Sequence, residues 1–416
     1  MDRFIVRGSG PLEGSVAVAG AKNSVLKLMA ASLMAEGRSV LRNVPRIVDV
    51  EMMSDLLTSM GVDVRRAEDD VLTIDVGSDI TPEAPYELVE RMRASIVVLG
   101  ALLARNGYAR VALPGGDNFG PRPIDMHISG LEALGVRFDS AHGYIEASCE
   151  SLRGTRVVLE FPSVGATENL LMAAVRAEGT TVIDNAAREP EIADLCAFLV
   201  RMGARIVGGG TSTIEIEGVD GLSPVDHTVI PDRIEAGTFL AAVGVAGGEI
   251  TLEGARPDHM DMLIRKLGEM GMRVSPSSDG VWAQAKGRLR AVDVSTLPYP
   301  GIATDYKPFF VAMLAVAEGV GIVTENLFSG RFRYVDELVR MGADIRTEGH
   351  HAVVRGRPSL SGAPVRAPDI RAGAALVVAA LGADGETVIS DASHVARGYE
   401  NLAGKLRAVG ADIETS

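Results

Sequence analysis

Cysteine and aromatic residues are scarce in this chain of 416 residues, which has two cysteines, one tryptophan and only 4% aromatic residues in total. Cys149 and Cys196 show no CxxC or other metal-like spacing, so we expect no structural disulfide and take the cytosol as the default compartment. Hydrophobic residues still make up 47% of the sequence, so the core must be built from Val, Leu, Ile, Ala and Met. That composition suits many short strands packed under helices and excludes a disordered chain.

Long apolar runs and an excess of positive charge are also lacking. No apolar stretch approaches the roughly 20 residues that a membrane helix needs, and the N-terminus lacks the apolar segment of a signal peptide. The formal net charge of −14 argues against nucleic acid or an anionic membrane surface as a partner. We therefore expect a cytoplasmic protein that binds any anionic ligand at a local cluster of cations.

An internal repeat is the strongest pattern that is present. Six times an apolar helix end is followed by glycine and then by a strand-like alternation, at Gly61, Gly135, Gly203, Gly271, Gly342 and Gly410. A second series runs in phase with the first, at Gly37, Gly107, Gly179, Gly248, Gly319 and Gly385. Each glycine fits a helix C-cap, where a residue without Cβ adopts the left-handed conformation at no cost. Six units of about 70 residues are too long for common solenoids and predict two globular lobes of three units each.

Charged residues concentrate at two positions of this repeat, both at the ends of elements. The first is the start of the Ala-rich helix, with Lys22-Asn23, Arg93, Asp232-Arg233, Asp305-Tyr-Lys307 and Asp369-Ile-Arg371. The second is the strand-to-helix turn half a unit later, with Asp117, Arg122, Arg331 and Arg397. Any one of these arginines alone is best interpreted as part of a solvated surface pair. Their recurrence at matching positions, together with the affinity of helix N-termini for anions, predicts a cleft for a polyanionic substrate.

Ordered motifs extend this pattern over the whole chain. They include Ala-Gly-Ala-Lys22-Asn23, Met-Arg93-Ala-Ser, Leu-Pro-Gly-Gly-Asp117, Arg122-Pro-Ile-Asp-Met-His127, Ser-Val-Gly165-Ala-Thr, Pro-Asp232-Arg233-Ile, Thr-Asp305, Arg331-Phe, Asp369-Ile-Arg371-Ala and Arg397-Gly-Tyr. In this order they resemble the UDP-N-acetylglucosamine 1-carboxyvinyltransferase family of enolpyruvyl transferases. The resemblance implies an α/β fold of two inverted, barrel-like lobes, each of three β-α-β-α-β-β repeats. It places the N-terminal lobe at residues 22–230 and the C-terminal lobe at residues 1–21 plus 231–416.

The activity that the resemblance implies is transfer of enolpyruvate from phosphoenolpyruvate to the 3′-hydroxyl of UDP-N-acetylglucosamine, with release of phosphate. This reaction is the first committed step of peptidoglycan precursor synthesis. It needs no metal ion and no organic cofactor. We expect these two small molecules as partners, no nucleic acid or membrane, and a monomer or weak homo-oligomer.

The family's site residues carry over position by position. Four of them are catalytic: Lys22, Asp117, Asp305 and Arg397. Substrate binding is expected from Asn23, Arg93, Arg122, Pro123, Ile124, Asp125, Met126, His127, Arg233, Leu327, Arg331, Asp369 and Arg371. In these roles Lys22, Arg122 and Arg397 would bind phosphate, and Arg331 and Arg371 would hold the carboxylate of phosphoenolpyruvate. Asp305 would accept the proton of the sugar hydroxyl, and the segment from Arg122 to His127 would line the uridine pocket.

Asp117 departs from the family, which has a cysteine here that the epoxide antibiotic fosfomycin alkylates. A carboxylate is a much poorer nucleophile than a thiolate, so the substitution predicts fosfomycin resistance with transferase activity retained. To act as an acid, Asp117 would have to be protonated. Nearby Arg122 would lower its pKa and burial would raise it, so the sequence leaves its role open between proton donor and gate.

Other departures keep two alternatives open. Tyr306, Lys307 and Phe309 replace a more amide-rich run after Asp305, and Ala396 stands where the family has an acid. These changes leave room for a paralogue that acts on another uridine nucleotide, such as UMP in secondary metabolism. A catalytically silent protein on the same scaffold is the second alternative. The presence of Lys22, Asp305 and Arg397 argues against it, because function follows the site and not the fold.

Overall fold

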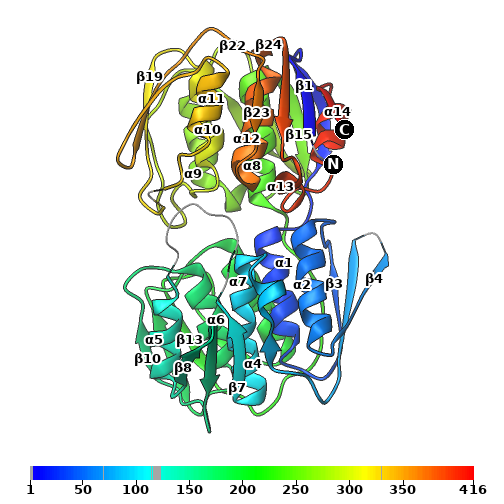
Figure 1. Ribbon diagram of the computed structural model, residues 1–416, viewed down its shortest axis with the longest axis vertical. Coiled ribbons are helices and arrows are strands. Elements are labelled where there is room, and N and C mark those ends of the chain that lie inside the picture. The colour runs from blue at the N-terminus through cyan, green and yellow to red at the C-terminus, as the bar shows by residue number, and fades with distance from the viewer. Residues whose placement is uncertain (1–2, 69, 114, 116–122, 329) are drawn as a thin grey trace. The chain divides into compact units, whose positions relative to one another are not determined.

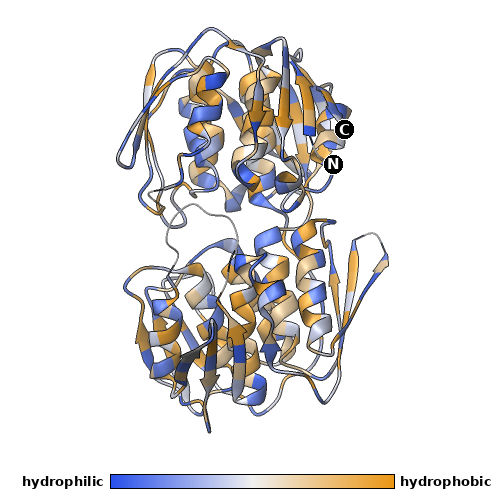
Figure 2. Cartoon of the chain, viewed as in Figure 1, coloured by the Kyte–Doolittle hydropathy of each residue, from blue (hydrophilic) through white to orange (hydrophobic). Residues whose placement is uncertain are grey.

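The computed structural model describes residues 3–416 except 69, 114, 116–122 and 329. The chain forms two compact units. Unit 1 combines the described residues up to Ala19 with Pro231–Ser416, and unit 2 consists of the described residues between Gly20 and Ile230. Each unit has its own hydrophobic core, and Figure 2 shows apolar residues distributed through the helices and strands of both.

Six four-stranded sheets share one topology: the first two strands pair in parallel, and the second, third and fourth pair antiparallel. The sheets of unit 2 are β14 (Asp226–Thr228), β3 (Gly37–Arg42), β5 (Val71–Val76) and β4 (Asp63–Glu68); β6 (Glu83–Ala84), β7 (Tyr108–Ala112), β9 (Tyr144–Ser148) and β8 (Arg137–Ala141); and β10 (Arg156–Val158), β11 (Thr180–Asp184), β13 (Thr213–Glu217) and β12 (Arg205–Val207). This recurrence in the described chain is the structural form of the sequence repeat.

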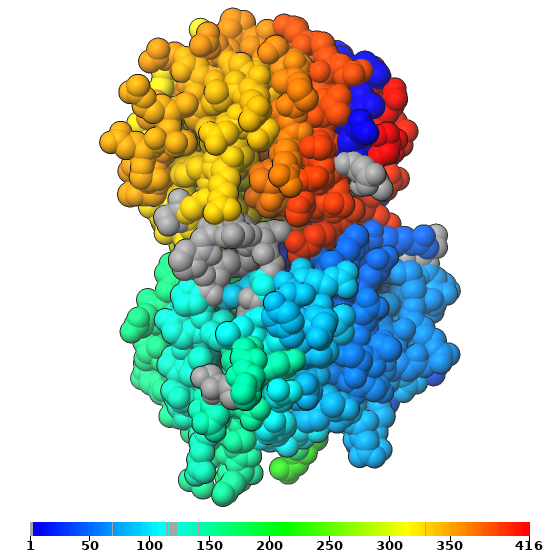
Figure 3. Space-filling view, viewed as in Figure 1, coloured from blue at the N-terminus to red at the C-terminus, as the bar shows by residue number. Residues whose placement is uncertain are grey.

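Unit 1 repeats the same pattern. Its sheets are β2 (Leu12–Ala17), β15 (Gly248–Glu253), β17 (Gly280–Ala285) and β16 (Arg273–Ser277); β18 (Val294–Ser295), β19 (Val320–Thr324), β21 (His351–Arg355) and β20 (Asp344–Glu348); and β23 (Pro364–Arg366), β25 (Glu386–Ser390), β1 (Arg3–Arg7) and β26 (Asp412–Thr415). A two-stranded sheet joins β22 (Leu360–Ser361) to β24 (Ala383–Asp384). Since β1 pairs with both β25 and β26, the first described strand lies beside the last strand of the chain in unit 1 (Figure 3).

Each unit is built around inner helices whose residues are buried on almost every side. In unit 1 these are α8 (Arg233–Ala246), α10 (Lys307–Val316) and α12 (Ile370–Leu381), which pack against one another (Figure 1). In unit 2 they are α1 (Lys22–Ser32), α4 (Val98–Asn106) and α6 (Val164–Ala174), with α4 packed against both others. Helices that are apolar all round need such buried positions.

The outer helices are α2 (Val48–Ser59), α5 (Asp125–Ala133), α7 (Pro190–Met202), α9 (Asp261–Glu269), α11 (Val335–Arg340) and α14 (Leu402–Ala408). The described chain also has two short α-helices, α3 (Tyr86–Val89) and α13 (Ser393–Ala396), and two 3-10 helices, η1 (Arg93–Val97) and η2 (Pro257–His259). No helix within the described ranges is long and apolar enough to cross a membrane.

The repeat glycines have the positive φ that the sequence predicts, although only Gly107 and Gly203 are themselves helix C-cap residues in the described chain. All twelve have positive φ, from 65° at Gly107 to 113° at Gly203, and these two are the C-cap residues of α4 and α7. Any other residue type would be strained there, since left-handed backbone is unfavourable for a residue with a Cβ. The glycines therefore fix where helices end and strands begin.

Candidate functional site

The inner helices of unit 1 all begin at charged residues. Asp232 caps α8 by accepting the backbone N–H groups of the second and third helical residues at 2.7 and 3.1 Å. Asp369 caps α12 in the same way, with both distances at 2.9 Å. α10 begins at Lys307, two residues after Asp305. Capping by aspartate satisfies backbone donors that the helix leaves unpaired, and it places a carboxylate at each of these ends.

Asp305 lies between two arginines of unit 1: Arg331 of the same repeat and Arg371 of the next one. Its Oδ1 accepts a hydrogen bond from Nη1 of Arg331 at 2.8 Å, and its Oδ2 accepts one from Nε of Arg371 at 3.1 Å. Both arginine side chains are buried. Burial alone would raise the pKa of Asp305, but the two guanidinium groups outweigh it and hold that pKa well below its usual range. The site therefore presents a fixed carboxylate anion inside a net positive cluster.

Tyr399 supports the Arg371 side of this cluster. The guanidinium carbon of Arg371 lies 5.2 Å from the centroid of the Tyr399 ring, a cation–π distance. The phenol oxygen is 2.8 Å from Oγ1 of Thr238, which belongs to α8. Burial raises the pKa of Tyr399 to about 12, so the ring stays neutral. This contact ties the start of α12 to α8.

A fully buried ion pair lies next to the cluster. Nζ of Lys307 is 3.0 Å from Oε2 of Glu325, and both side chains are 0% exposed. Thr304 connects the pair to the site, because its Oγ1 donates to Oε2 of Glu325 at 2.7 Å and accepts from Nη1 of Arg331 at 3.1 Å. Burial lowers the pKa of Lys307, Glu325 raises it in part, and the result is about 8.

Leu327, Arg233 and Arg397 are further predicted residues of unit 1. The backbone N–H of Leu327 donates to Oε1 of Glu325 at 2.8 Å. Arg233 is buried at the start of α8, 5.5 Å from the ring of Tyr299. Arg397 is half-buried and directly follows α13. The structure thus brings Asp305, Arg331 and Arg371 into direct contact.

Unit 2 places Lys22 at the first residue of α1, after an N-cap, Ala21, that has no side-chain cap. The Lys22 ammonium is 2.8 Å from Oδ2 of Asp49, which is in the first turn of α2 and is 2% exposed. Asn23 follows on α1, and its carbonyl accepts a hydrogen bond from Nζ of Lys27 at 2.9 Å. Lys22 is therefore a buried cation held in position by a buried carboxylate.

His127 is held in one tautomer. Asn169 accepts the backbone N–H of Gly100 at 2.7 Å through Oδ1 and donates to the carbonyl of Ile96 at 3.2 Å through Nδ2, which fixes the orientation of its amide. The same Nδ2 lies 2.8 Å from Nδ1 of His127, so Nδ1 must accept and Nε2 must carry the proton. Burial, assisted by Arg93, lowers the pKa of His127 to about 4, and the ring is neutral at pH 7.

The segment around His127 is described from Pro123 onward. Nη2 of Arg93 reaches the carbonyl of Pro123 at 3.5 Å, and Ile124 is the residue before α5. Asp125 and Met126 open that helix, exposed and half-buried respectively. Asp117 and Arg122, the two predicted residues on the preceding loop, lie outside the described residues.

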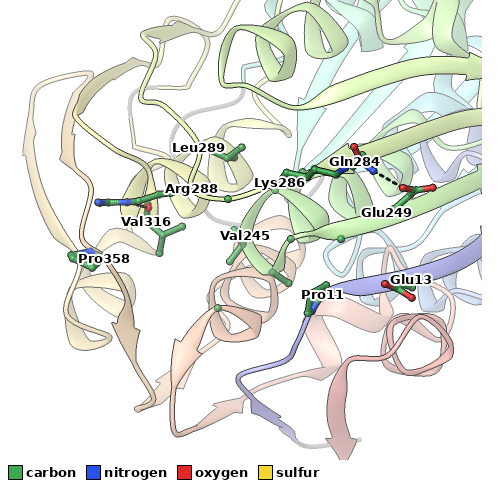
Figure 4. A pocket seen from close by; sticks show the side chains of 17 residues that line it. Pro11, Glu13, Val245, Glu249, Gln284, Lys286, Arg288, Leu289, Val316 and Pro358 are labelled. Atoms are coloured by element: carbon green, nitrogen blue, oxygen red, sulfur yellow. Dashed lines mark hydrogen bonds between the residues drawn. The ribbon is translucent and has the colours of Figure 1, made fainter.

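A cavity of about 720 Å³ lies at the opposite end of the unit 1 helices (Figure 4). Val245, Val316 and Gly382 line it, from the C-terminal ends of α8, α10 and α12. Arg288 donates to the carbonyl of Val316 at 2.8 Å and to that of Ala317 at 2.7 Å, so its charge is used to cap α10. Helix C-termini disfavour anions, and this cavity is not the candidate site. The described residues include no group of three His, Cys, Asp or Glu side chains that could hold a metal ion.

Sequence reasoning missed several residues of the charged network. The sequence shows Lys307 among the charged residues at helix starts and as a departure from the family pattern, but gives it no role in the site, and neither Asp49 nor Glu325 belongs to a motif. The available signal was a lysine within the otherwise apolar start of a helix, Asp-Tyr-Lys-Pro-Phe-Phe, because a buried lysine requires an acidic partner. The identity of that partner depends on the fold.

Comparison with known proteins places this geometry in a family. The EPSP synthase (3-phosphoshikimate 1-carboxyvinyltransferase) family model matches residues 6–406. The UDP-N-acetylglucosamine 1-carboxyvinyltransferase of Gluconacetobacter diazotrophicus is 53% identical over 416 residues, covering 100% of this chain and 99% of that protein. That of Corynebacterium jeikeium is 51% identical over 413 residues and covers 99% of both.

Solved structures agree with the sequence comparisons. The enolpyruvyl transferase NikO from Streptomyces tendae is 28% identical, with a TM-score of 0.88 over 99% of this chain and 98% of its own. EPSP synthase from Acinetobacter baumannii, at 20% identity and a TM-score of 0.77 over 100% of both chains, shows the shared fold. The expected enolpyruvyl transferase fold is confirmed, and this chain belongs to the EPSP synthase (3-phosphoshikimate 1-carboxyvinyltransferase) family.

Proposed function

We propose that this protein transfers the enolpyruvyl group of phosphoenolpyruvate to the 3′-hydroxyl of UDP-N-acetylglucosamine and releases phosphate. Full-length identity of about 50% to proteins of that name supports the acceptor. The observation that carries the chemistry is the Asp305 carboxylate held between Arg331 and Arg371. A carboxylate acts as a general base when it is positioned within hydrogen-bond reach of the proton it removes.

In the proposed reaction the sugar oxygen bonds to C2 of phosphoenolpyruvate, C3 gains a proton, and a tetrahedral ketal forms. Loss of phosphate from C2 and of a proton from C3 then restores the double bond. Arg331 and Arg371 are suited to the substrate carboxylate, since guanidinium groups bind carboxylates through paired N–H donors. Lys22, Arg122 and Arg397 would bind the phosphate as it leaves. No step requires a metal ion or an organic cofactor.

The low pKa of Asp305 indicates when this residue could act as a base. A carboxylate paired with two guanidinium groups is a weak base, so it gains basicity when an incoming substrate carboxylate takes over part of their hydrogen bonding. Binding of phosphoenolpyruvate would then activate the base for the acceptor. We also assign the product to peptidoglycan precursor synthesis in the cytoplasm.

The test is release of phosphate from phosphoenolpyruvate with a panel of acceptors: UDP-N-acetylglucosamine, other UDP-sugars and UMP. The proposal predicts the highest kcat/KM with UDP-N-acetylglucosamine. Preference for UMP would instead establish the paralogue, and absence of turnover with every acceptor would establish a silent scaffold.

Running the same panel with fosfomycin tests the resistance predicted from Asp117. The wild-type protein should keep its activity after prolonged incubation with the epoxide, because a carboxylate is a poor nucleophile. Asp117→Cys should become inactivated with time. Stoichiometric, time-dependent inactivation of the wild type would refute the predicted resistance.

A further inference from the structure

Lys307 is a buried cation for which the proposed reaction has no direct use. It is the first residue of α10, where the helix dipole disfavours positive charge, and its side chain is 0% exposed, so no substrate reaches it. A buried ion pair is weak evidence for stability, because the loss of hydration of both charges offsets their attraction. The contacts of Lys307 and Glu325 indicate a different role.

Glu325 holds the beginning of the segment that leads to Arg331. Five donors meet its two carboxylate oxygens: the hydroxyls of Thr296 and Thr304 at 2.7 Å, the backbone N–H groups of Leu327 and Phe328 at 2.8 and 3.1 Å, and the Lys307 ammonium at 3.0 Å. Thr304 immediately precedes Asp305. One carboxylate therefore fixes both the start of the arginine-bearing segment and the residue before the candidate base.

Lys307 holds the end of the same segment. Its ammonium donates a hydrogen bond to the carbonyl of Arg331 and lies 3.9 Å from the centroid of the Phe332 ring. The guanidinium of Arg331 in turn donates to Thr304 and to Asp305. The segment is thus held at both ends. Nη1 of Arg331 is directed at Asp305, the candidate base.

We propose that Lys307 and Glu325 are positioning residues that hold Arg331 against Asp305 and thereby set the affinity for phosphoenolpyruvate. The inference rests on the proposed function, in which Arg331 binds the carboxylate of that substrate. It predicts that the pair matters for substrate binding more than for folding.

The test is the double variant Lys307→Met/Glu325→Gln, which removes both buried charges together. Its melting temperature should stay within a few degrees of the wild type, because replacing both partners leaves no unpaired buried charge. The KM for phosphoenolpyruvate should rise at least about tenfold, the effect of a misplaced binding group. The KM for the acceptor should change less than twofold. Lys307→Gln combined with Glu325→Gln keeps an N–H donor for the Arg331 carbonyl. This second double variant should recover part of the affinity for phosphoenolpyruvate that Lys307→Met/Glu325→Gln loses.

Lys405→Met/Glu235→Gln is the matched control. Lys405 and Glu235 form another ion pair of unit 1, at 2.7 Å, with side chains 20% and 3% exposed. The control should not raise the KM for phosphoenolpyruvate, whatever it does to the melting temperature. An equal rise in both double variants would show that the effect is general loosening, and it would overturn the proposal.

A pH profile gives a second readout. The charged and titratable groups facing Lys307 are Glu325 after β19, Arg331 and Tyr334 before α11, and Asp369 at α12. With a pKa near 8, Lys307 loses its charge above that pH, so the wild-type KM for phosphoenolpyruvate should rise there and the double variant should show no such rise. A purely structural role predicts that the folded protein improves over the same range. The unfolded lysine keeps its proton to about pH 10.5, so deprotonation of Lys307 in the folded state increases the folding stability as pH rises from 8.

Crystal structures of the wild type and the double variant separate this inference from the proposed function. The distance from Nη1 of Arg331 to Oδ1 of Asp305, 2.8 Å in the present structure, should exceed hydrogen-bond distance in the variant. An unchanged distance or an unchanged KM would overturn the positioning role. Absence of turnover by the wild type would refute the proposed function alone, because the distance is measured without substrate.

Discussion

The two units place different electrostatic groups at the same position of the same repeat. At the helix starts of unit 1, Asp232 and Asp369 cap their helices, and Asp305 is bound by two arginines. At the helix starts of unit 2, α1 has no side-chain cap and begins with Lys22, and the neutral ring of His127 faces the start of α6 at Gly165. One scaffold thus supports a carboxylate held by two arginines in unit 1, and in unit 2 a neutral histidine together with two buried lysines of α1, Lys22 and Lys27.

The repeat therefore fixes the position of the polar residues and not their chemistry. Glycines and apolar residues recur in all six repeats because helix ends and cores have the same requirements everywhere. The polar residues at the helix starts differ because nothing in the packing dictates them. The proposed chemistry assigns base and carboxylate binding to unit 1 and nucleotide recognition to unit 2. It assigns phosphate binding to Lys22 and Arg122 of unit 2 and to Arg397 of unit 1.

Replacement of the candidate base should have the largest effect. Asp305→Asn keeps the size of the side chain but removes its charge, so kcat should fall by about 10²–10⁴-fold, the usual contribution of a general base. Phosphate release measures this. Asp258→Asn, at an exposed aspartate of the same unit that pairs with Arg256, is the control and should leave kcat unchanged. If Asp305→Asn kept more than a tenth of the wild-type activity, Asp305 would not be the general base. The proposed difference in role between the two units would then be refuted.

Replacement of Lys22, one of the two buried lysines of unit 2, should have the second largest effect. Lys22→Met should lower kcat/KM for phosphoenolpyruvate by about 10²–10³-fold, since the ammonium stabilises charge that develops on the leaving phosphate. Asp49→Asn should have a smaller effect, because Lys22 keeps its charge but loses the carboxylate that positions it. Steady-state kinetics on both variants check the order, and Lys266→Met, at a surface ion pair with Glu269, is the control. A larger loss in Asp49→Asn than in Lys22→Met would contradict the assigned roles.

Much of the fold could be predicted from the sequence, because its signals are local. The glycine at position 203 ends a helix wherever the chain goes next, and its positive φ needs no tertiary information. The pairing of β1 with β25 is different: residues 3–7 meet residues 386–390 from the far end of the chain, and only the family resemblance placed the N-terminal strand with the C-terminal lobe.

The site likewise has residues that the sequence could predict and contacts that it could not. Asp305, Arg331 and Arg371 could be named as candidates from their repeat positions and motifs, but their mutual contacts join residues up to 66 positions apart. Glu325 could not be named at all. A single acid after a strand is usually solvated, and only the fold places it against a lysine at the start of the preceding helix.

The neutral histidine of unit 2 should make the stability of the protein depend on pH between 4 and 6.5. The folded pKa of His127 is about 4 and its ordinary value is 6.5, so the unfolded chain binds the proton first as pH falls. Stability is therefore lost between pH 6.5 and 4, by up to about 3 kcal/mol from this group. Denaturant unfolding of the wild type and His127→Gln across that range measures the loss, which should be smaller in the variant. His350→Gln, at an exposed histidine, should follow the wild type; equal pH dependence in all three proteins would show that His127 is not held neutral.

Gly165→Ala should have the smallest effect and is the finest test of neutral recognition in unit 2. Gly165 has ordinary helical backbone in the first turn of α6, so alanine causes no backbone strain, but its Cβ would lie 3.0 and 3.1 Å from the Cε1 and Nε2 atoms of the His127 ring. The ring must shift by a few tenths of an ångström, and Nε2 carries the proton that it can donate. We expect the KM for the UDP-sugar to rise less than about tenfold with kcat unchanged, since the change removes only part of one hydrogen bond. Because the strain acts through the ring, the same substitution should add nothing in a His127→Ala background. Additive effects of the two substitutions would mean that Gly165 serves the packing of α6 and not the orientation of His127.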